Sequence, residues 1–362
     1  MHMADALLAP AVAATMYATS MTAASVSVRR LSKEDGFGED AGAKKLPTMA
    51  VMSALVFAGQ MVNYTIPGTG SSGHLCGGML LTALLGPYAG FLSMIVVLTI
   101  QCLFFADGGL MALGANIWNM AFYGCFVGYF LIYRPIMRGK LFRGEKGGKA
   151  KIILASVLGC VLTLQLGSFS VVVETSLSGV TDLPFQGFLA LMQPIHLAIG
   201  LVEGAVTAAV LCFVYEARPE LLQDVGETAN RGRFSGKATL LVLAATVVVI
   251  AGGFSLLASQ NPDGLEWSLF GNEDGGYAAN MGLDEENYGI ASDTSKTLGA
   301  VQEKTAFLPD YSFRTGESDL GTSVSGLAGS AMVAGCAVIV CLAGRVVRKK
   351  KENEKNRKAF KL

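Results

Sequence analysis

The chain has 362 residues, of which 52% are apolar or aromatic and only 15% are charged. Soluble domains carry about 25% charged residues, so this composition excludes an ordinary water-soluble enzyme. The apolar residues are concentrated in long uncharged runs, several of them near the roughly 20 residues that cross a bilayer as a helix. We therefore expect an all-α, polytopic membrane protein. The formal net charge is zero, but positive and negative charges are sorted into separate segments.

The distribution of basic residues predicts the topology. Of the 28 lysines and arginines, 25 fall into four segments. These segments are 29–45, 134–151, 218–237 and 345–361. Because cytoplasmic loops are enriched in lysine and arginine, we assign all four to the cytoplasmic side. The loop 260–320 contains twelve Asp and Glu residues and is predicted to lie outside.

Joining these sides in chain order predicts nine transmembrane segments, with the N-terminus outside and the C-terminus inside. The segments are 5–28, 46–66, 75–86, 88–106, 112–133, 152–173, 190–215, 238–259 and 322–343. Segment 75–86 is too short to span a bilayer alone, so we expect it to be tilted or buried among other helices. The glycine-rich segment 67–74 is expected on the outer side or dipping into it.

The polar stretch 216–237 is interpreted as a cytoplasmic linker between two units. The N-terminal unit, 1–215, has seven predicted spans, and the C-terminal unit, 238–347, has two. A basic tail, 348–362, follows. The first apolar run lacks the basic start of a signal peptide, so we expect the mature chain to keep Met1.

Two of the three histidines, His2 and His74, are predicted to lie at the same outer face. The α-amine of Met1, the amide nitrogen of residue 2 and the ring nitrogen of His2 can close fused chelate rings around one ion. His74 follows a glycine-rich loop that permits close approach and can supply another nitrogen. A plane of nitrogens is preferred by Ni(II) and Cu(II), whereas zinc favours a tetrahedron and Mg(II) or Ca(II) favour oxygens. These residues predict a site for nickel or a related late divalent metal.

Simpler interpretations of the same residues remain open. A histidine near an N-terminus is usually solvated, and one at a membrane interface often only anchors the chain. His196 is expected to make a structural hydrogen bond, and Cys76 is a weak candidate ligand. Glu203 lies deep in a span, which indicates either a functional role or a buried glutamate bonded within the helices. Three amides near the outer ends of spans can support the site, or instead cap helices and bond across them: Asn63, Asn116 and Asn119.

Two motifs that would indicate an enzyme are missing. The nearest approach to a nucleotide-binding G-x-x-x-x-G-K-[ST] loop has Arg231 at the first glycine and Ala238 in place of Ser or Thr. The zinc-protease motif H-E-x-x-H does not occur. We therefore expect a non-enzymatic chain that binds neither nucleotide nor nucleic acid.

Residues 1–215 resemble the substrate-capture component of cobalt and nickel energy-coupling-factor transporters. Three segments carry the resemblance: Met1-His2-Met3-Ala4-Asp5-Ala6-Leu7, the stretch 66–78 that contains Gly-Thr-Gly-Ser-Ser-Gly-His, and 107–120, which begins Asp107-Gly108-Gly109. The later segments Asn261-Pro262-Asp263-Gly264-Leu265-Glu266-Trp267 and Pro309-Asp310-Tyr311 resemble the small two-span component of the same transporters, which carries a Pro-Asp-Gly-Leu-Glu motif. The two components are fused in this chain.

The resemblance implies a seven-helix bundle plus a two-helix unit in the inner membrane of a prokaryotic cell. It also implies a coupling membrane subunit and two cytoplasmic ATPases as partners, with Ni(II) or Co(II) as the transported substrate. The metal would be bound by the amine of Met1 with His2 and His74. This chain has one residue more before His74 than the Gly-Thr-Ser-Gly-His that is commoner in the family, so the resemblance does not predict the orientation of the His74 ring. The loop 260–320 also carries an acidic insertion.

Metal coordination displaces protons from the amine and imidazole nitrogens, so binding should weaken as the pH falls. Uptake unchanged at about pH 5 would contradict this expectation. The acidic loop can concentrate cations, and the basic tail can contact anionic lipid. The sequence does not choose between cobalt and nickel, since both accept nitrogen donors.

Two other functions are weighed against the transporter component. A stand-alone divalent-cation channel or ion-gradient-driven carrier should have carboxylates along a path through the membrane, and the predicted spans offer little beyond Glu174 and Glu203. A metal sensor should have a cytoplasmic output domain, and the sequence contains none of any size.

Overall fold

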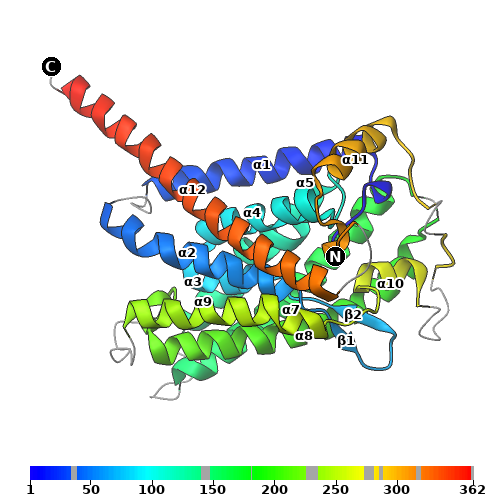
Figure 1. Ribbon diagram of the computed structural model, residues 1–362, viewed down its shortest axis with the longest axis horizontal. Helices are drawn as coiled ribbons and strands as arrows, with labels where there is room; N and C mark the ends of the chain where they lie inside the picture. Colours follow the sequence, from blue (N-terminus) through cyan, green and yellow to red (C-terminus); the bar gives the residue numbers. More distant parts are fainter. Residues whose placement is uncertain are drawn as a thin grey trace.

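A computed structural model describes residues 1–33, 39–139, 147–180, 182–225, 235–272, 281–284, 288–314 and 319–359. Within these ranges the chain forms long helices that lie side by side, together with a short hairpin (Figure 1). The predicted all-α class is confirmed. Parts of the linker 216–237, the outer loop 260–320 and the basic tail 348–362 lie outside the described residues.

The elements follow the chain in two groups. The first group consists of η1 (Asp5–Leu7), α1 (Pro10–Lys33), α2 (Glu39–Gln60), β1 (Tyr64–Ile66), β2 (Ser71–Gly73), α3 (Gly78–Leu85), α4 (Pro87–Phe105), α5 (Leu113–Asn116), η2 (Ile117–Tyr133), α6 (Arg134–Arg138), α7 (Gly147–Leu177), α8 (Phe185–Ala217) and η3 (Pro219–Leu221). The second group consists of α9 (Gly236–Gly252), η4 (Phe254–Leu257), α10 (Gly264–Phe270), α11 (Asp293–Thr305), η5 (Pro309–Tyr311) and α12 (Asp319–Ala359). The segments α5, η2 and α6 form one continuous helix, in which η2 has the wider hydrogen-bond spacing of a π-helix.

The glycine-rich segment after α2 folds as an antiparallel hairpin of β1 and β2, with Tyr64 opposite Gly73. In its turn Gly68 and Gly70 adopt φ angles of 78° and 73°, which glycine reaches without a steric penalty. The predicted span 46–66 is therefore too long at its outer end, because the helix stops at Gln60 and the hairpin begins.

The short helix α3 is buried over all eight of its residues, as expected for the predicted segment 75–86. Gly86, with a φ of 84°, and Pro87 separate α3 from α4. Proline fits the first turn of a helix because that position has no helical partner for its missing N–H. The boundary expected between the predicted segments 75–86 and 88–106 is therefore present, as a break between two helices at Gly86.

The helices α7 and α8 pack closely along their lengths. A Cβ atom on Gly200 would lie 2.9 Å from Cα of Val161, and one on Gly204 would lie 2.7 Å from Cα of Val157. Small residues at such positions let two membrane helices approach each other backbone to backbone. This pair forms a rigid support for the outer loops.

The C-terminal group packs against the N-terminal group through α2, which contacts both α9 and α12. Gly329 of α12 faces the ring of Phe57, and a Cβ atom there would lie 2.1 Å from the ring. The predicted acidic loop is not irregular throughout, since it contains α10 and α11. Figure 1 shows both of these helices at the same end of the molecule as the N-terminus and the β1–β2 hairpin.

In the part of the chain that the structure describes, five helices are long and apolar enough to cross a membrane: Pro87–Phe105, Leu113–Arg138, Gly147–Leu177, Phe185–Ala217 and Leu320–Val340. Two shorter apolar helices are Leu46–Gln60 and Gly236–Gly252. The protein is thus a multi-pass membrane protein. The count of nine crossings also needs α1, which is interrupted by Ser and Thr residues, and the eight-residue α3, so that count stays a prediction.

Candidate metal site

The N-terminal segment is buried within the end of the bundle that carries the β1–β2 hairpin and α10 (Figure 1). Met1 is 5% exposed and Met3 is fully buried. Asn116 holds the main chain of Met3 from both sides: Met3 N donates to Oδ1 at 2.8 Å, and Nδ2 donates to the Met3 carbonyl at 3.2 Å. The amide of Gly109 donates to the same carbonyl at 2.9 Å. These contacts fix the main chain beside His2.

The two glycines after Asp107 allow this close approach. A Cβ atom on Gly109 would lie 1.8 Å from Oδ1 of Asp5, and one on Gly108, whose φ is 77°, would lie 3.2 Å from Cβ of His2. Asp5 in turn accepts a hydrogen bond from the Ala112 amide at 3.0 Å. The Asp-Gly-Gly sequence therefore forms a surface on which the N-terminal segment lies.

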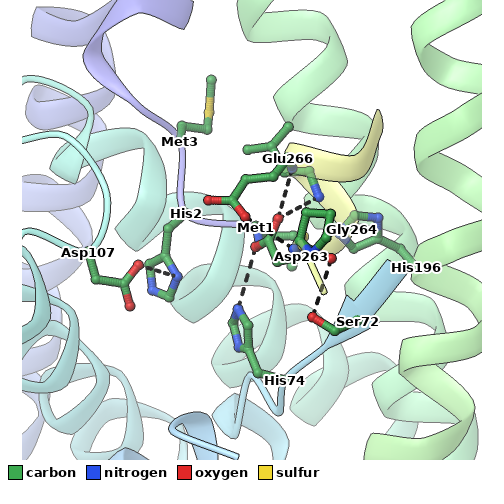
Figure 2. A network of polar contacts seen from close by, with 12 residues as sticks. Met1, His2, Met3, Ser72, His74, Asp107, His196, Asp263, Gly264 and Glu266 are labelled. Carbon is green, nitrogen blue, oxygen red and sulfur yellow. Dashed lines mark hydrogen bonds and ion pairs between the residues drawn. The ribbon is translucent and has the colours of Figure 1, made fainter. Parts of the chain in front are cut away.

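The structure brings Met1, His2 and His74 together, although His74 lies far from the N-terminus in sequence. The rings of His2 and His74 are stacked, with centroids 5.3 Å apart and planes 21° apart. Figure 2 shows these residues converging, with Asp107 beside His2 and Asp263 beside Met1. The predicted ligand groups are thus neighbours.

His2 is buried and is uncharged at neutral pH. Burial lowers the pKa of its ring to about 4, although Asp107 opposes this shift, and His74 and the N-terminal amine add to it. Nδ1 lies 3.1 Å from Oδ1 of Asp107, so the neutral ring presents its N–H to this carboxylate. Nε2 is buried and has no hydrogen-bond partner among the described residues. Chelation through Nδ1, the ring nitrogen nearer the main chain, requires the metal to replace Asp107.

Asp263, from the C-terminal group, contacts two of the proposed ligand groups. Its Oδ2 accepts a hydrogen bond from the Met1 ammonium at 2.9 Å and lies 3.8 Å from Nε2 of His74. Burial opposes ionisation of this carboxyl, but the ammonium and His74 hold its pKa well below the ordinary value. The Asp263 charge, together with burial, raises the pKa of Glu266 to about 7.

Asp263 was not among the predicted site residues. A signal was available, because Asp263 and Glu266 have the spacing of a capping box at the start of a helix. The structure contains that box: Oδ1 of Asp263 accepts from the amides of Leu265 and Glu266 at 2.7 and 2.9 Å. A capping box predicts a helix start, but it does not predict which part of the protein that start will contact.

Glu203 supports the turn that follows His74. Its two carboxylate oxygens accept hydrogen bonds from the amides of Cys76 at 2.8 Å and Gly77 at 2.9 Å. Gln60 donates to the Cys76 carbonyl at 2.7 Å from the other side. Of the two interpretations left open for Glu203, the structure therefore favours a buried glutamate with a structural hydrogen-bonding task, here at the edge of the candidate site.

The other candidate residues have different surroundings. His196 makes the expected structural hydrogen bond, from Nδ1 to the carbonyl of Met192 at 2.7 Å. Cys76 donates its S–H to the Met120 carbonyl at 3.1 Å. Asn119 donates to Glu174 at 2.8 Å and to the sulfur of Met3 at 3.5 Å. Asn63 meets the C-terminal group through its main-chain carbonyl, which accepts from the amide of Ser259 at 2.8 Å.

A cavity of about 720 Å³ lies beside His2, between the N-terminal segment and the outer helices α10 and α11. Its acidic lining residues are Asp5, Asp107, Asp263, Glu266 and Asp310. Lys296 and Gln302 also line it. The cavity therefore presents carboxylates from both groups of elements to a cation approaching His2.

Side chains alone do not form a metal site in the described part of the chain, since no three His, Cys, Asp or Glu residues there lie close enough to hold an ion. A site at His2 and His74 therefore requires main-chain nitrogens at the N-terminus. An amine next to a histidine at position 2 supplies them, which is the donor set that square-planar late divalent metals accept.

Comparison with known proteins agrees with a membrane transport component in two fused parts. A family model described as the cobalt uptake substrate-specific transmembrane region matches residues 2–221, and a PDGLE domain model matches residues 237–348. The putative fused nickel transport protein NikMN of Archaeoglobus fulgidus is 34% identical over 336 residues, which cover 92% of this chain and 95% of that protein. The fused nickel transport protein NikMN of Rhodobacter capsulatus is 30% identical, with 70% and 74% covered.

The crystal structure of a transition metal transporter is 29% identical, with a TM-score of 0.49, and the match covers 61% of this chain and 96% of that one. The helical fold and the family matches together identify a multi-pass membrane protein of a metal-transport family. The chain belongs to the family of cobalt-uptake substrate-specific transmembrane proteins, in the form that is fused to a PDGLE domain.

Proposed function

We propose that this chain captures Ni(II) or Co(II) at its outer face and delivers the ion to the cytoplasm as one component of an ATP-driven energy-coupling-factor importer. The ligands are the α-amine of Met1, the main-chain and Nδ1 nitrogens of His2, and a ring nitrogen of His74. The observation that carries the proposal is the burial of the N-terminus against His74, with the two imidazoles stacked at 5.3 Å.

Several contacts support a metal-binding role for this segment. A merely structural N-terminus does not need a buried ammonium beside two imidazoles whose side chains are only 8% and 12% exposed, because burial of charged and polar groups is unfavourable without partners. Asn116 accepts a hydrogen bond from Met3, next to His2, and Glu203 accepts one from Cys76, just after His74. Both chain segments that carry these nitrogens are therefore held in place. We assign Asn116 to the support of the ligands, since it fixes the residue that follows His2, and we propose a weaker role for Asn119.

Coordination exchanges protons for the metal. The Met1 amine is an ammonium that donates to Asp263, so it must lose a proton before it can bind an ion. His2 is already neutral at pH 7, because burial lowers the pKa of its ring to about 4. The main-chain amide of His2 must also lose its proton, and the proton on Nδ1 must move to Nε2, before both nitrogens of His2 can bind the ion.

The decisive experiment is calorimetric titration of the purified full-length protein with Ni(II) and with Co(II). His2→Gln, His74→Gln and a variant with one residue added before Met1 should each lose at least about a hundredfold in affinity, since each removes a donor nitrogen or displaces the amine. His196→Gln is the matched control, because His196 is bonded within α8, and it should bind within a few-fold of wild type. Normal binding by the extended variant would exclude the N-terminal chelate. The ion bound more tightly by wild type is the preferred substrate.

A further inference from the structure

The C-terminal PDGLE domain reaches into the candidate metal site of the N-terminal unit. Asp263 contributes a carboxylate oxygen that lies 2.9 Å from the Met1 amine and 3.8 Å from Nε2 of His74. The two nitrogens belong to different segments of the N-terminal unit, and Oδ2 of Asp263 contacts both (Figure 2). The Asp263 side chain is only 16% exposed, so this contact is not a surface ion pair.

The local structure fixes the direction of this carboxylate. Its Oδ1 is occupied by the amides of Leu265 and Glu266 at the start of α10. Only Oδ2 is left to face Met1 and His74. The helix start therefore aims one oxygen of Asp263 at the site.

The segment that carries Asp263 is bonded directly to the strand that precedes His74. The amide of Ser72 donates to the Pro262 carbonyl at 2.8 Å, and the Ser72 hydroxyl donates to the Asn261 carbonyl at 2.8 Å. Both segments pack on α8, since a Cβ atom on Gly73 or Gly264 would meet Ile199 or Ile195 at 2.5 Å. Asp263 and His74 are thus held by one small assembly, and neither can move far without the other.

The segment Pro309-Asp310-Tyr311 of the same domain reaches the other side of the same site. The Tyr311 hydroxyl donates to Oδ2 of Asp107, while Oδ1 of Asp107 faces Nδ1 of His2. The C-terminal domain therefore contacts the amine directly and the His2 ring through Asp107.

We propose that Asp263, contributed by the C-terminal domain, belongs to the capture site and that its negative charge attracts the divalent ion bound by the nitrogen ligands. This inference rests on the proposed function. A carboxylate within hydrogen-bond distance of one donor nitrogen and close to a second lies where a divalent ion on those nitrogens is attracted by its charge. The capture site is then shared between the two fused domains and is incomplete without the second.

The test uses Ni(II) titration of the full-length protein carrying Asp263→Asn. Asparagine caps a helix about as well as aspartate, so α10 should keep its start while the charge is removed. The expected loss is tenfold or more in affinity, in the range of about 10–100-fold typical of residues that support metal ligands. Asp293→Asn is the matched control, because it makes the same charge change at an exposed position in the first turn of α11, outside the lining of the cavity, and it should bind within about threefold of wild type.

The outcomes separate this inference from the proposed function. Wild-type affinity in Asp263→Asn, with binding still lost in His2→Gln, would overturn the role of Asp263 and leave the nitrogen site in place. Equal losses in Asp263→Asn and Asp293→Asn would also overturn it, since the effect would then come from the general negative charge of the C-terminal domain. Wild-type affinity in His2→Gln would exclude the nitrogen site, and the role of Asp263 would fall with it.

Discussion

Two carboxylates hold the nitrogen groups at the start of the chain: Asp263 binds the Met1 ammonium and Asp107 faces His2. Buried polar and charged groups need such partners, because an unpaired one loses its hydration without compensation. These two contacts must also change when a metal ion binds in the proposed way. An ion bound by these nitrogens must replace a proton of the amine and the proton of the His2 amide, and the Nδ1 proton that faces Asp107 must move to Nε2.

Acidification should loosen the N-terminal segment. The pKa of His2 is lowered from 6.5 to about 4 by burial, so below pH 6.5 the detached segment takes up a proton that the docked segment does not. Docking is therefore most favourable above pH 6.5 and weakens as the pH falls toward 4, by roughly 3 kcal/mol at most. The ion pair of Asp263 with the Met1 ammonium destabilises docking only at pH values below the ordinary pKa of a carboxyl group, because the pKa of Asp263 is depressed.

Hydrogen exchange at the amides of Met3 and Gly109, corrected for the intrinsic effect of pH, measures this loosening. Both amides are bonded in the docked segment and should exchange faster at about pH 4.5 than at pH 7. His2→Gln lacks the titrating ring and should show no such change over this interval. If His2→Gln showed the same faster exchange at low pH as wild type, a group other than His2 would be responsible for the loosening.

Close packing of two glycines on α8 connects the hairpin and the start of α10 to the bundle. The backbone at Gly264 lies so near Ile195 that a Cβ atom would approach its Cγ2 to 2.5 Å. Overpacking of this kind typically costs about 1–3 kcal/mol and moves the backbone. Because Asp263 immediately precedes Gly264, a shift here moves the carboxylate at the proposed metal site.

Gly264→Ala should lower both thermal stability and Ni(II) affinity, with a stability loss of about 1–3 kcal/mol. Gly299→Ala is the matched control: Gly299 lines the same cavity from α11, and nothing lies within 4 Å of its added Cβ. Alanine also favours a helix, so this control should be as stable as wild type or slightly more so. Thermal unfolding and calorimetry measure the two effects. An unaffected Gly264→Ala protein would show that α10 can move without disturbing the site.

The two fused domains form one membrane-embedded body, in which α9 and α12 pack on α2 and the outer segments meet around the N-terminus. The stretch between the two domains also binds the bundle, since the amide of Gln223 donates to the Ala83 carbonyl at 2.8 Å, next to Gly86. Such a body can present its metal to the other side only by moving as a whole or by opening between helices. We propose that energy for this motion comes from partner ATPases.

Nickel accumulation in proteoliposomes should require the coupling subunit, both ATPases and ATP. The chain alone should bind Ni(II) without accumulating it, since its sequence lacks a nucleotide-binding loop. Replacing the phosphate-binding lysine of the ATPases should abolish uptake while leaving Ni(II) binding unchanged. Accumulation by the chain alone under an ion gradient would instead support the carrier alternative.

Several features followed from local patterns. Long uncharged runs predicted membrane helices because hydrocarbon requires internally bonded, apolar segments, and Gly86-Pro87 predicted the break between α3 and α4. His2 and His74 were predicted to lie at one face because the basic residues predict the same side for both. These inferences need only composition, order and the chemistry of single residues.

Other features depend on contacts between segments distant in sequence. The glycine-rich segment ended α2 earlier than predicted because a hairpin could pair there and bind Pro262, about 190 residues away. Neither the spacing around Asp263 nor its capping box indicates that Oδ2 faces Met1, because a pattern specifies a helix start but not its neighbour. Side-chain identity and hydropathy thus fix the helices and their order, whereas packing on α8 decides which carboxylates reach the N-terminal amine.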